Sequence, residues 1–209
     1  SGDGDVVAFA AGPDGRFIAS VAGRNSVSIL DSRNGLEEMA GFEPGDSGVV
    51  EAIAFSPEGR YLALGRAGGE GGRLTVLDAE QGYAEQASKS FGGPVLSVSF
   101  SPDGAYLAAG AENGTARIFD VAAGFEETHS YQHEVGVHTM DVSPDGRYLA
   151  SGAMVGGKSA GMKVMELGSF EEVFSASHEY EVAHAGFSPE GNYFAYQSFA
   201  TTIRMLRTT

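Results

Sequence analysis

Residues 95–120, VLSVSFSPDGAYLAAGAENGTARIFD, contain the pattern that decides the fold. At the centre is the tetrapeptide Ser101-Pro102-Asp103-Gly104, a strong turn signal, because Pro presets φ, Asp can bond the backbone and Gly accepts a left-handed conformation. Apolar residues at alternate positions before it, such as Val98 and Phe100, indicate a strand with one buried face. We therefore predict two antiparallel strands joined by this turn.

The turn recurs along the chain, and the prolines of successive copies are 42–45 residues apart. Each copy has a valine seven residues before its proline. After each glycine, the second residue is aromatic and the fourth is an alanine. A repeat of this length is typical of repeat architectures. The other four copies are Gly12-Pro13-Asp14-Gly15, Ser56-Pro57-Glu58-Gly59, Ser143-Pro144-Asp145-Gly146 and Ser188-Pro189-Glu190-Gly191.

Two more strands are predicted in each repeat. The third strand is apolar, and the predicted segments are 27–30, 74–77, 116–119, 162–165 and 202–206. A fourth, outer strand with a charged exposed face is predicted from segments such as 36–39, 125–128 and 170–173. Charges on an exposed edge oppose association between sheets. Four strands in 42–45 residues, without helices, form the blade of a β-propeller.

We therefore predict an all-β fold, a β-propeller of about five four-stranded antiparallel blades in a single domain, residues 1–209. The approximate repeats are 1–44, 45–89, 90–131, 132–176 and 177–209. The last blade is expected to lack its outer strand, because the sequence ends where that strand would begin. Three arrangements remain open: a ring closed at five blades, part of a larger ring, or a partner that pairs with the last edge strand.

The repeats resemble the WD-repeat family, as segments 95–104 and 107–120 and their counterparts in all five repeats indicate. The family's tryptophan is absent, and its Gly-His pair survives only at His133 and His178. The resemblance implies a non-catalytic scaffold that binds a protein partner, or joins a larger assembly, through loops on one face. It also implies structural roles for both histidines. Leu30, Leu77, Phe119, Met165 and Leu206 stand in the tryptophan's place.

Composition restricts the function classes. The formal charge of −15 disfavours nucleic acid and anionic membrane surfaces as partners. The absence of cysteine excludes disulfides and a cysteine nucleophile. No apolar run reaches the roughly 18 residues of a membrane span. A soluble protein is expected; its compartment stays open, with an intracellular location favoured.

Two motifs suggest chemistry, but their contexts favour structural roles. Residues 152–159, GAMVGGKS, fit the phosphate-loop pattern, yet a strand and not a helix is predicted to follow, so a glycine-rich hairpin is the preferred interpretation. The five histidines all lie between residues 129 and 184, without the spacing of a ligand pair. We therefore predict no cofactor, no metal site and no catalytic residue.

The candidate binding residues come from the loops expected on one face. Two hairpin loops are lengthened, from Arg66 to Arg73 and from Met154 to Gly161, and loops on a rigid scaffold concentrate binding residues. The predicted set is Arg66, Arg73, Phe91, Met154, Lys158, His133 and His178. The alternative function is a hydrolase or lyase that acts on a small molecule or carbohydrate in a central channel, near Glu134, His138, Glu181 and His184.

Overall fold

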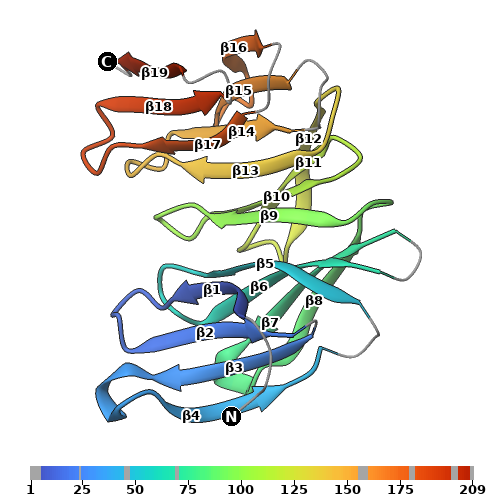
Figure 1. Cartoon of the computed structure of the whole chain (residues 1–209), viewed down its shortest axis with the longest axis vertical. Coiled ribbons are helices and arrows are strands. Elements are labelled where there is room, and N and C mark those ends of the chain that lie inside the picture. Colours follow the sequence, from blue (N-terminus) through green and yellow to red (C-terminus); the bar gives the residue numbers. More distant parts are fainter. Residues whose placement is uncertain are drawn as a thin grey trace. The chain divides into compact units, whose positions relative to one another are not determined.

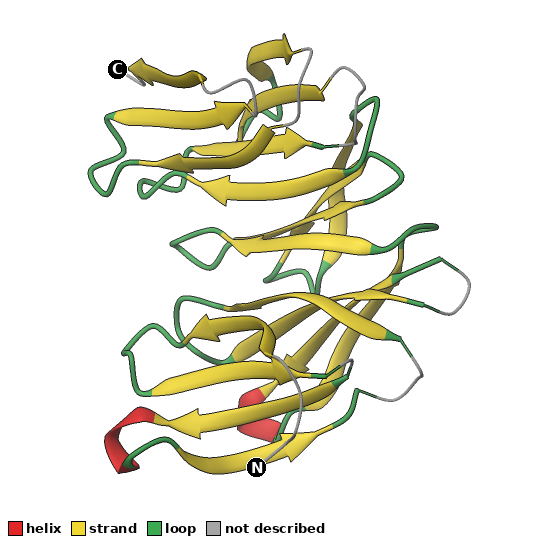
Figure 2. Cartoon of the chain, in the orientation of Figure 1, coloured by secondary structure: helices red, strands yellow, loops and turns green. Residues whose placement is uncertain are grey.

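The computed structural model of the chain describes residues 6–23, 25–44, 48–68, 71–154, 160–178, 182–198 and 202–207. These residues form strands β1 to β19 and two 3-10 helices, η1 (Ser32–Asn34) and η2 (Ala79–Gln81), with no α-helix among them (Figures 1 and 2). The chain divides into two compact units, Ser1–Val98 and Ser99–Thr209. Each unit is described separately below.

The first unit contains two four-stranded antiparallel sheets, the first and second blades, with the strands in sequence order. The first blade contains β1 (Val6–Ala11), β2 (Phe17–Ala22), β3 (Ser26–Asp31) and β4 (Glu37–Phe42). The second blade contains β5 (Val49–Phe55), β6 (Tyr61–Ala67), β7 (Arg73–Asp78) and β8 (Ala84–Ser90).

The boundary between the units lies within β9, the first strand of the third blade. The third blade contains β9 (Val95–Phe100), β10 (Tyr106–Ala111), β11 (Thr115–Asp120) and β12 (Glu126–Gln132). The fourth blade contains β13 (Val137–Val142), β14 (Tyr148–Ala153), β15 (Ala160–Glu166) and β16 (Glu172–His178). The fifth blade contains only β17 (Val182–Phe187), β18 (Tyr193–Ser198) and β19 (Thr202–Arg207).

The predicted fold class is confirmed: the described residues form β-propeller blades of four antiparallel strands, and the last blade has three. The proline tetrapeptides join the first and second strands of each blade, as predicted. The single domain over residues 1–209 and the repeat limits stay predictions.

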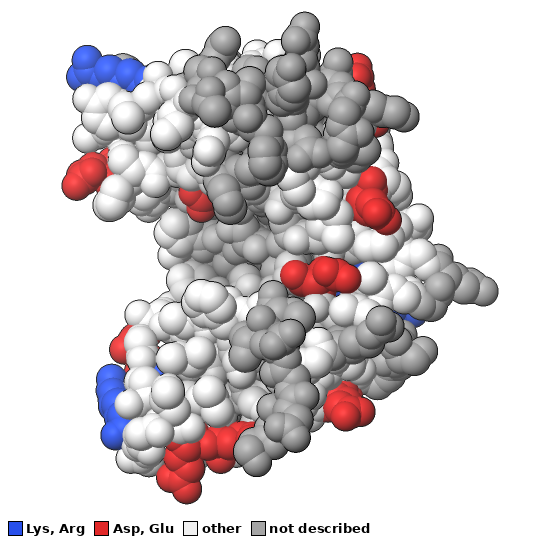
Figure 3. Space-filling model, viewed as in Figure 1, with Lys and Arg blue, Asp and Glu red and all other residues white. Residues whose placement is uncertain are grey.

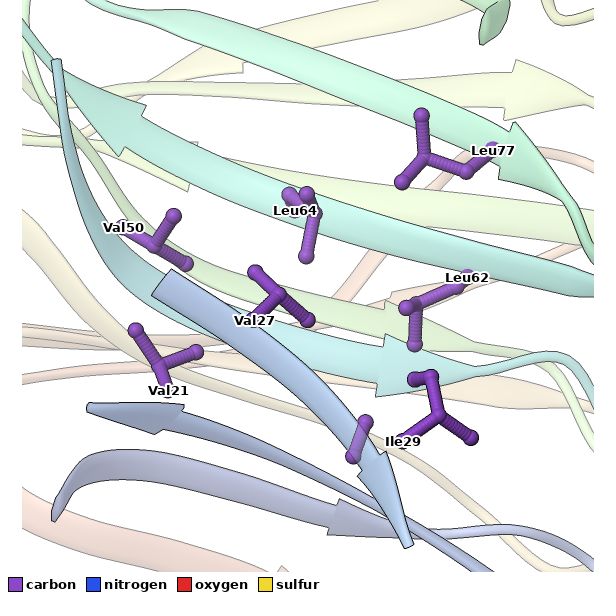
Figure 4. Close-up of a cluster of buried hydrophobic side chains, with 8 residues drawn as sticks. Val21, Val27, Ile29, Val50, Leu62, Leu64 and Leu77 are labelled. Carbon is purple, nitrogen blue, oxygen red and sulfur yellow. The ribbon is translucent and has the colours of Figure 1, made fainter. Parts of the chain in front are cut away.

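The core of the first unit lies between its two blades (Figure 4). Val21, Val27 and Ile29 of the first blade pack against Leu62 and Leu64 of the second, and none of the five is more than 1% exposed. We call the sheet face that packs against the following blade the trailing face, and the opposite one the leading face. Each such buried side chain contributes about 1.5–3 kcal/mol, so packing between the two blades is a large part of the stability of this unit.

The second unit repeats this arrangement twice. Ala116 and Ile118 on the trailing face of the third blade pack against Met140 and Leu149 of the fourth. Met162 and Val164 of the fourth blade pack in turn with Val182, Phe194 and Tyr196 of the fifth. The same third-strand positions therefore carry the core in each of these interfaces.

Candidate functional site

The two ends of each blade differ in chemistry. We call the end with the proline tetrapeptide, where the third strand also turns into the fourth, the turn end. The opposite end, where the second strand turns into the third, is the hairpin end. Their comparison separates residues that build the blade from residues that are available for binding.

A buried serine hydroxyl closes the turn end of most blades. The Oγ atoms of Ser56, Ser101 and Ser143 accept hydrogen bonds from the N–H groups of the following tyrosines at 2.8–2.9 Å. All three serines are at most 1% exposed. In the first blade a glycine, Gly12, takes the same place. The turn end is therefore held by a recurrent local network.

An arginine and an acidic residue reinforce three of these turns. Arg16 contacts Asp31, and Arg60 contacts Asp78, each at 3.0 Å, with both carboxylates 1% exposed. Arg147 makes the same contact with Glu166 at 3.0 Å. Each guanidinium also lies 4.7–4.9 Å from the ring centroid of the next residue, a cation–π contact. The third blade has Ala105 in place of the arginine.

The acidic partners have lowered pKa values. For Asp31 the first cause is the hydrogen bond from the N–H of Arg33, with Arg16 adding to it. For Asp78 burial alone would raise the pKa, but hydrogen bonds from Arg60, Gln81 and the N–H of Glu80 together lower it. These carboxylates are stabilised in their ionised form, as structural anchors and not as general acids.

In each of the first four blades, a bulky residue with positive φ follows the turn between the third and fourth strands. Leu36, Tyr83, Phe125 and Phe170 have φ values of 57–64°. Tyr83 stacks on Phe42 of the preceding blade at 5.3 Å, and Phe170 stacks on His129 of the preceding blade at 5.0 Å. The left-handed backbone is unfavourable for such residues, and at Tyr83 and Phe170 the interblade stacking offsets part of its cost, whereas Leu36 is 53% exposed.

The hairpin ends, in contrast, differ from blade to blade. In the second blade Arg66 and Arg73 are directly opposite each other on β6 and β7. Both lie in strands, not in the loop between them. Arg66 is 4% exposed and its Nη2 donates to the carbonyl of Pro44 at 2.8 Å, whereas Arg73 is exposed and its Nη1 donates to Ser88 Oγ at 2.8 Å.

A groove of about 460 Å³ begins at these arginines and follows the leading face of β7. We call it the Arg73 groove; its lining includes Arg66, Arg73, Thr75, Leu77, Tyr83 and Glu85 of the second blade and Phe42, Glu43 and Pro44 of the first. The stacked rings of Phe42 and Tyr83 form an apolar wall. The Oγ1 atom of Thr75 is buried there and has no hydrogen-bond partner among the described residues. The groove therefore combines an apolar wall with polar groups that can bind a partner.

His133 lies at the hairpin end of the second unit and has a structural role. Its Nε2 is 2.9 Å from Ser151 Oγ, and Tyr131 Oη donates to the same oxygen at 3.0 Å. Ser151 can therefore donate its proton to a neutral His133. Since Ser151 is 0% exposed, its hydroxyl is not accessible to a substrate as a nucleophile.

Burial explains the titration of this network. It lowers the pKa of His133 to about 4, with the positive charge of Lys163 adding to the effect, and raises the pKa of Tyr131 to about 12. Both groups are neutral at pH 7. His133 also borders a second groove, of about 360 Å³, together with Lys163, Ser175 and Ser177.

Of the other predicted residues, Phe91 belongs to the first unit and Met154 to the second. Phe91 is 2% exposed, and its N–H donates to the carbonyl of Gly72 at 3.2 Å. The N–H of His133 makes the equivalent hydrogen bond to the carbonyl of Gly114 at 2.9 Å. Met154 is half-buried, and its N–H donates to Gly136. Lys158 lies outside the described residues, as does the side chain of His178, whose backbone ends β16.

The phosphate-loop pattern starts inside a strand. Gly152 belongs to β14, where an added Cβ would lie 2.7 Å from Thr139 and 3.0 Å from Val182. This glycine therefore permits close packing with the next blade. Residues 155–159 lie outside the described part, and the next described element is strand β15.

The alternative channel site stays a prediction. Glu134 is exposed and His138 half-buried, while Glu181 and the side chain of His184 lie outside the described residues.

Among the residues that are described, no group of three or more His, Cys, Asp or Glu side chains could hold a metal ion. The same residues include no helix that is long and apolar enough to span a membrane. In the view of Figure 3, acidic side chains are dispersed and basic ones form no broad patch.

Comparison with known proteins identifies the repeats. The family model "WD domain, G-beta repeat" matches residues 86–120 and 125–158. These two segments are WD repeats. The first match begins in outer strand β8 and ends with β11, and the second begins at outer strand β12 and includes β13 and β14. A WD repeat in sequence therefore joins the outer strand of one blade to the inner strands of the next.

Three curated relatives match part of the chain. They are serine-threonine kinase receptor-associated proteins of Rattus norvegicus, Mus musculus and Homo sapiens, which are 31%, 31% and 30% identical over 106 residues. The match covers 51% of this chain and only 28% of each relative. Together with the WD repeats, these relatives support a protein-interaction scaffold in general terms.

A solved structure shares the fold. Hydrazine synthase of Kuenenia stuttgartiensis superposes with a TM-score of 0.81 at 18% identity. The superposition covers 100% of this chain and 65% of that one. At this identity the likeness concerns the fold alone.

Sequence reasoning missed two features. The arginine after the turn glycine in three repeats was a visible signal for the ion pairs at the turn end. No local sequence pattern predicts the Arg73 groove, because Phe42 and Pro44 in its lining come from the preceding repeat.

Proposed function

We propose that this chain is a non-catalytic interaction scaffold that binds a segment of a protein partner in the Arg73 groove and through neighbouring hairpin-end loops. The observation that carries the proposal is the unequal use of the two blade ends. The turn ends of the first, second and fourth blades repeat one ion-paired network, whereas among the described residues only the second blade places two arginines opposite each other beside an open groove. Residues that differ between otherwise equivalent blades are candidates for a local role, and of this pair only Arg73 is exposed.

The groove suggests the chemistry of the partner segment. The Phe42–Tyr83 wall suits an apolar or aromatic side chain, and the exposed guanidinium of Arg73 suits a carboxylate or a backbone carbonyl. A partner group that reaches Thr75 Oγ1 would satisfy a buried hydroxyl, which adds to binding specificity. These features support the binding of an extended segment, with anchors of both kinds.

A photo-crosslinking amino acid tests this placement. It replaces Glu85, which is exposed and borders the groove, or Glu58, which is exposed at the turn end of the same blade. Each chain is irradiated in extract of the source cells. We expect a discrete adduct from position 85 and none from position 58.

Two arginine variants make the assay specific. Arg73→Ala should reduce the adduct at position 85 roughly tenfold or more, because a charged anchor is lost. Arg33→Ala, at an exposed turn-end arginine, should leave it unchanged. Equal adducts at both positions, or an adduct at 85 that is unaffected by Arg73→Ala, would refute the groove as the binding site.

We also propose that the edge strand β19 accepts a partner strand, because the fifth blade has three strands among the described residues. Backbone N–H and C=O groups on such an edge pair readily with another chain. Hydrogen exchange of the β19 amides should then slow when the partner isolated by crosslinking is added. Unchanged exchange at saturating partner would exclude strand addition.

A further inference from the structure

A glutamate recurs on the outer strand of the first four blades, two positions after the left-handed residue of the turn end. In two blades it forms an ion pair with a basic residue of the neighbouring third strand. Glu127 lies 3.6 Å from Arg117 in the third blade, and Glu172 lies 2.9 Å from Lys163 in the fourth. The four glutamates are Glu38, Glu85, Glu127 and Glu172.

The second blade keeps the glutamate but lacks its basic partner. Thr75 stands at the position of Arg117 and Lys163, three residues before the acidic residue that ends the third strand. Glu85 is exposed, and its carboxylate forms no ion pair or hydrogen bond with any residue that the structure describes. The second blade therefore presents a carboxylate whose usual partner is missing.

The missing side chain also changes the shape of the surface. In the fourth blade the groove beside His133 includes Lys163 in its lining, but neither Met165 nor Glu172, which are opposite each other on β15 and β16. The Arg73 groove extends over the counterparts of these two residues, Leu77 and Glu85. The surface that the Lys163–Glu172 ion pair occupies in the fourth blade is thus open in the second.

We propose that the Arg73 groove binds a lysine or arginine side chain of the partner segment, with its apolar stem over Leu77 and its cationic end at Glu85. The partner then supplies the basic group that Arg117 and Lys163 supply within their own blades. The stem of such a side chain packs well on apolar surface, and its charge strengthens the hydrogen bond to a carboxylate. This inference rests on the proposed function and names a residue type that the groove selects.

The charges around the groove agree with this assignment. Glu43 is exposed and also lines the groove, and the formal charge of the chain is −15, which attracts a basic segment. Arg73 donates to Ser88 and does not pair with Glu85. The partner segment therefore places a basic group at Glu85 and an acceptor at Arg73. A crosslinking residue at position 85 removes the first of these contacts, so the adduct there forms through the remaining ones.

Selection from a random heptapeptide library, followed by calorimetric titration of the selected peptides, tests the inference. Peptides selected on the unmodified chain should contain Lys or Arg. Glu85→Gln should weaken their binding roughly tenfold, because a charge-assisted hydrogen bond is lost. Glu58→Gln is the matched control, at an exposed glutamate of the turn end in the same blade, and should leave the affinity unchanged. Selection on Glu85→Lys should favour acidic residues instead.

A second variant closes the groove from within. Thr75→Lys supplies the basic residue in the same chain, as Lys163 does in the fourth blade, and should abolish peptide binding. Circular dichroism shows whether this chain is folded, and the Glu85 variants, at an exposed residue, carry the test if it is not.

The outcomes separate this inference from the proposed function. Peptides that need Arg73 but contain no basic residue, or that bind Glu85→Gln as tightly as the unmodified chain, would overturn the inference and leave the groove as a binding site. A library that yields no peptide sensitive to Arg73→Ala would overturn both.

Discussion

The turn ends and the hairpin ends of the blades are made of the same strands, yet they carry different chemistry. At the turn ends a buried serine, an arginine–carboxylate pair and a left-handed apolar residue recur in most blades. At the hairpin ends the second blade has opposed arginines and the fourth has a buried histidine network. Repetition within one chain therefore distinguishes residues that build every blade from residues with a local role.

The largest expected effect concerns the left-handed residues of the turn ends. Phe125 is 1% exposed and Leu36 53% exposed at equivalent positions. Phe125→Ala should lower the free energy of unfolding by about 3–5 kcal/mol, because a buried ring is lost, and Leu36→Ala by less than about 1 kcal/mol. Urea denaturation measures both. Equal costs would show that the turn conformation, and not burial of the side chain, is what these residues stabilise.

The second prediction uses the histidine at a hairpin end. The folded state keeps His133 neutral down to a pKa of about 4, whereas the unfolded chain takes up its proton near pH 6.5. Stability from this residue is therefore complete above pH 6.5 and falls as the pH drops toward 4, by on the order of 2–3 kcal/mol. Denaturation at several pH values gives the free energy of unfolding as a function of pH. Its slope between pH 6.5 and 4 should be shallower for His133→Gln than for His129→Gln. Identical slopes would contradict a buried neutral His133.

The third prediction compares two equivalent carboxylates. Asp78 has an arginine partner, whereas the third blade, which contains Asp120, has Ala105 at the position of that arginine. Asp78→Asn should lower Tm by roughly 4–6 °C, and Asp120→Asn by clearly less, because only the first removes a buried carboxylate that pairs with an arginine, Arg60. Differential scanning calorimetry gives both values. Similar losses would mean that capping of the following turn, common to both, is the main role.

The smallest effect on stability is expected at the Arg73 groove. Arg73 is exposed, and its hydrogen bond to Ser88 Oγ links two side chains at the surface. Arg73→Ala should change the free energy of unfolding by no more than about 0.5 kcal/mol. A larger loss in urea denaturation would place Arg73 among the structural residues and weaken the contrast between the two ends.

Local chemistry explains why the blades could be predicted from sequence. The proline turns, the alternating apolar strands and the acidic strand ends act over a few residues, so the 42–45-residue period revealed them. The burial of Arg66 and Phe91 could not be inferred in this way, because it depends on contacts with Pro44 and Gly72 across a loop or an interface between blades. The groove beside Arg73 was missed for the same reason: its walls come from two repeats.

The most direct test of the account puts one variant from each end through the same two assays, thermal unfolding and crosslinking from position 85. We predict that Asp78→Asn lowers Tm and, while still folded, retains the adduct, and that Arg73→Ala keeps the Tm and loses the adduct. An Arg73→Ala chain that loses stability like Asp78→Asn, or a folded Asp78→Asn chain that no longer crosslinks, would contradict the division between the structural ion pairs of the turn end and the binding residues of the Arg73 groove.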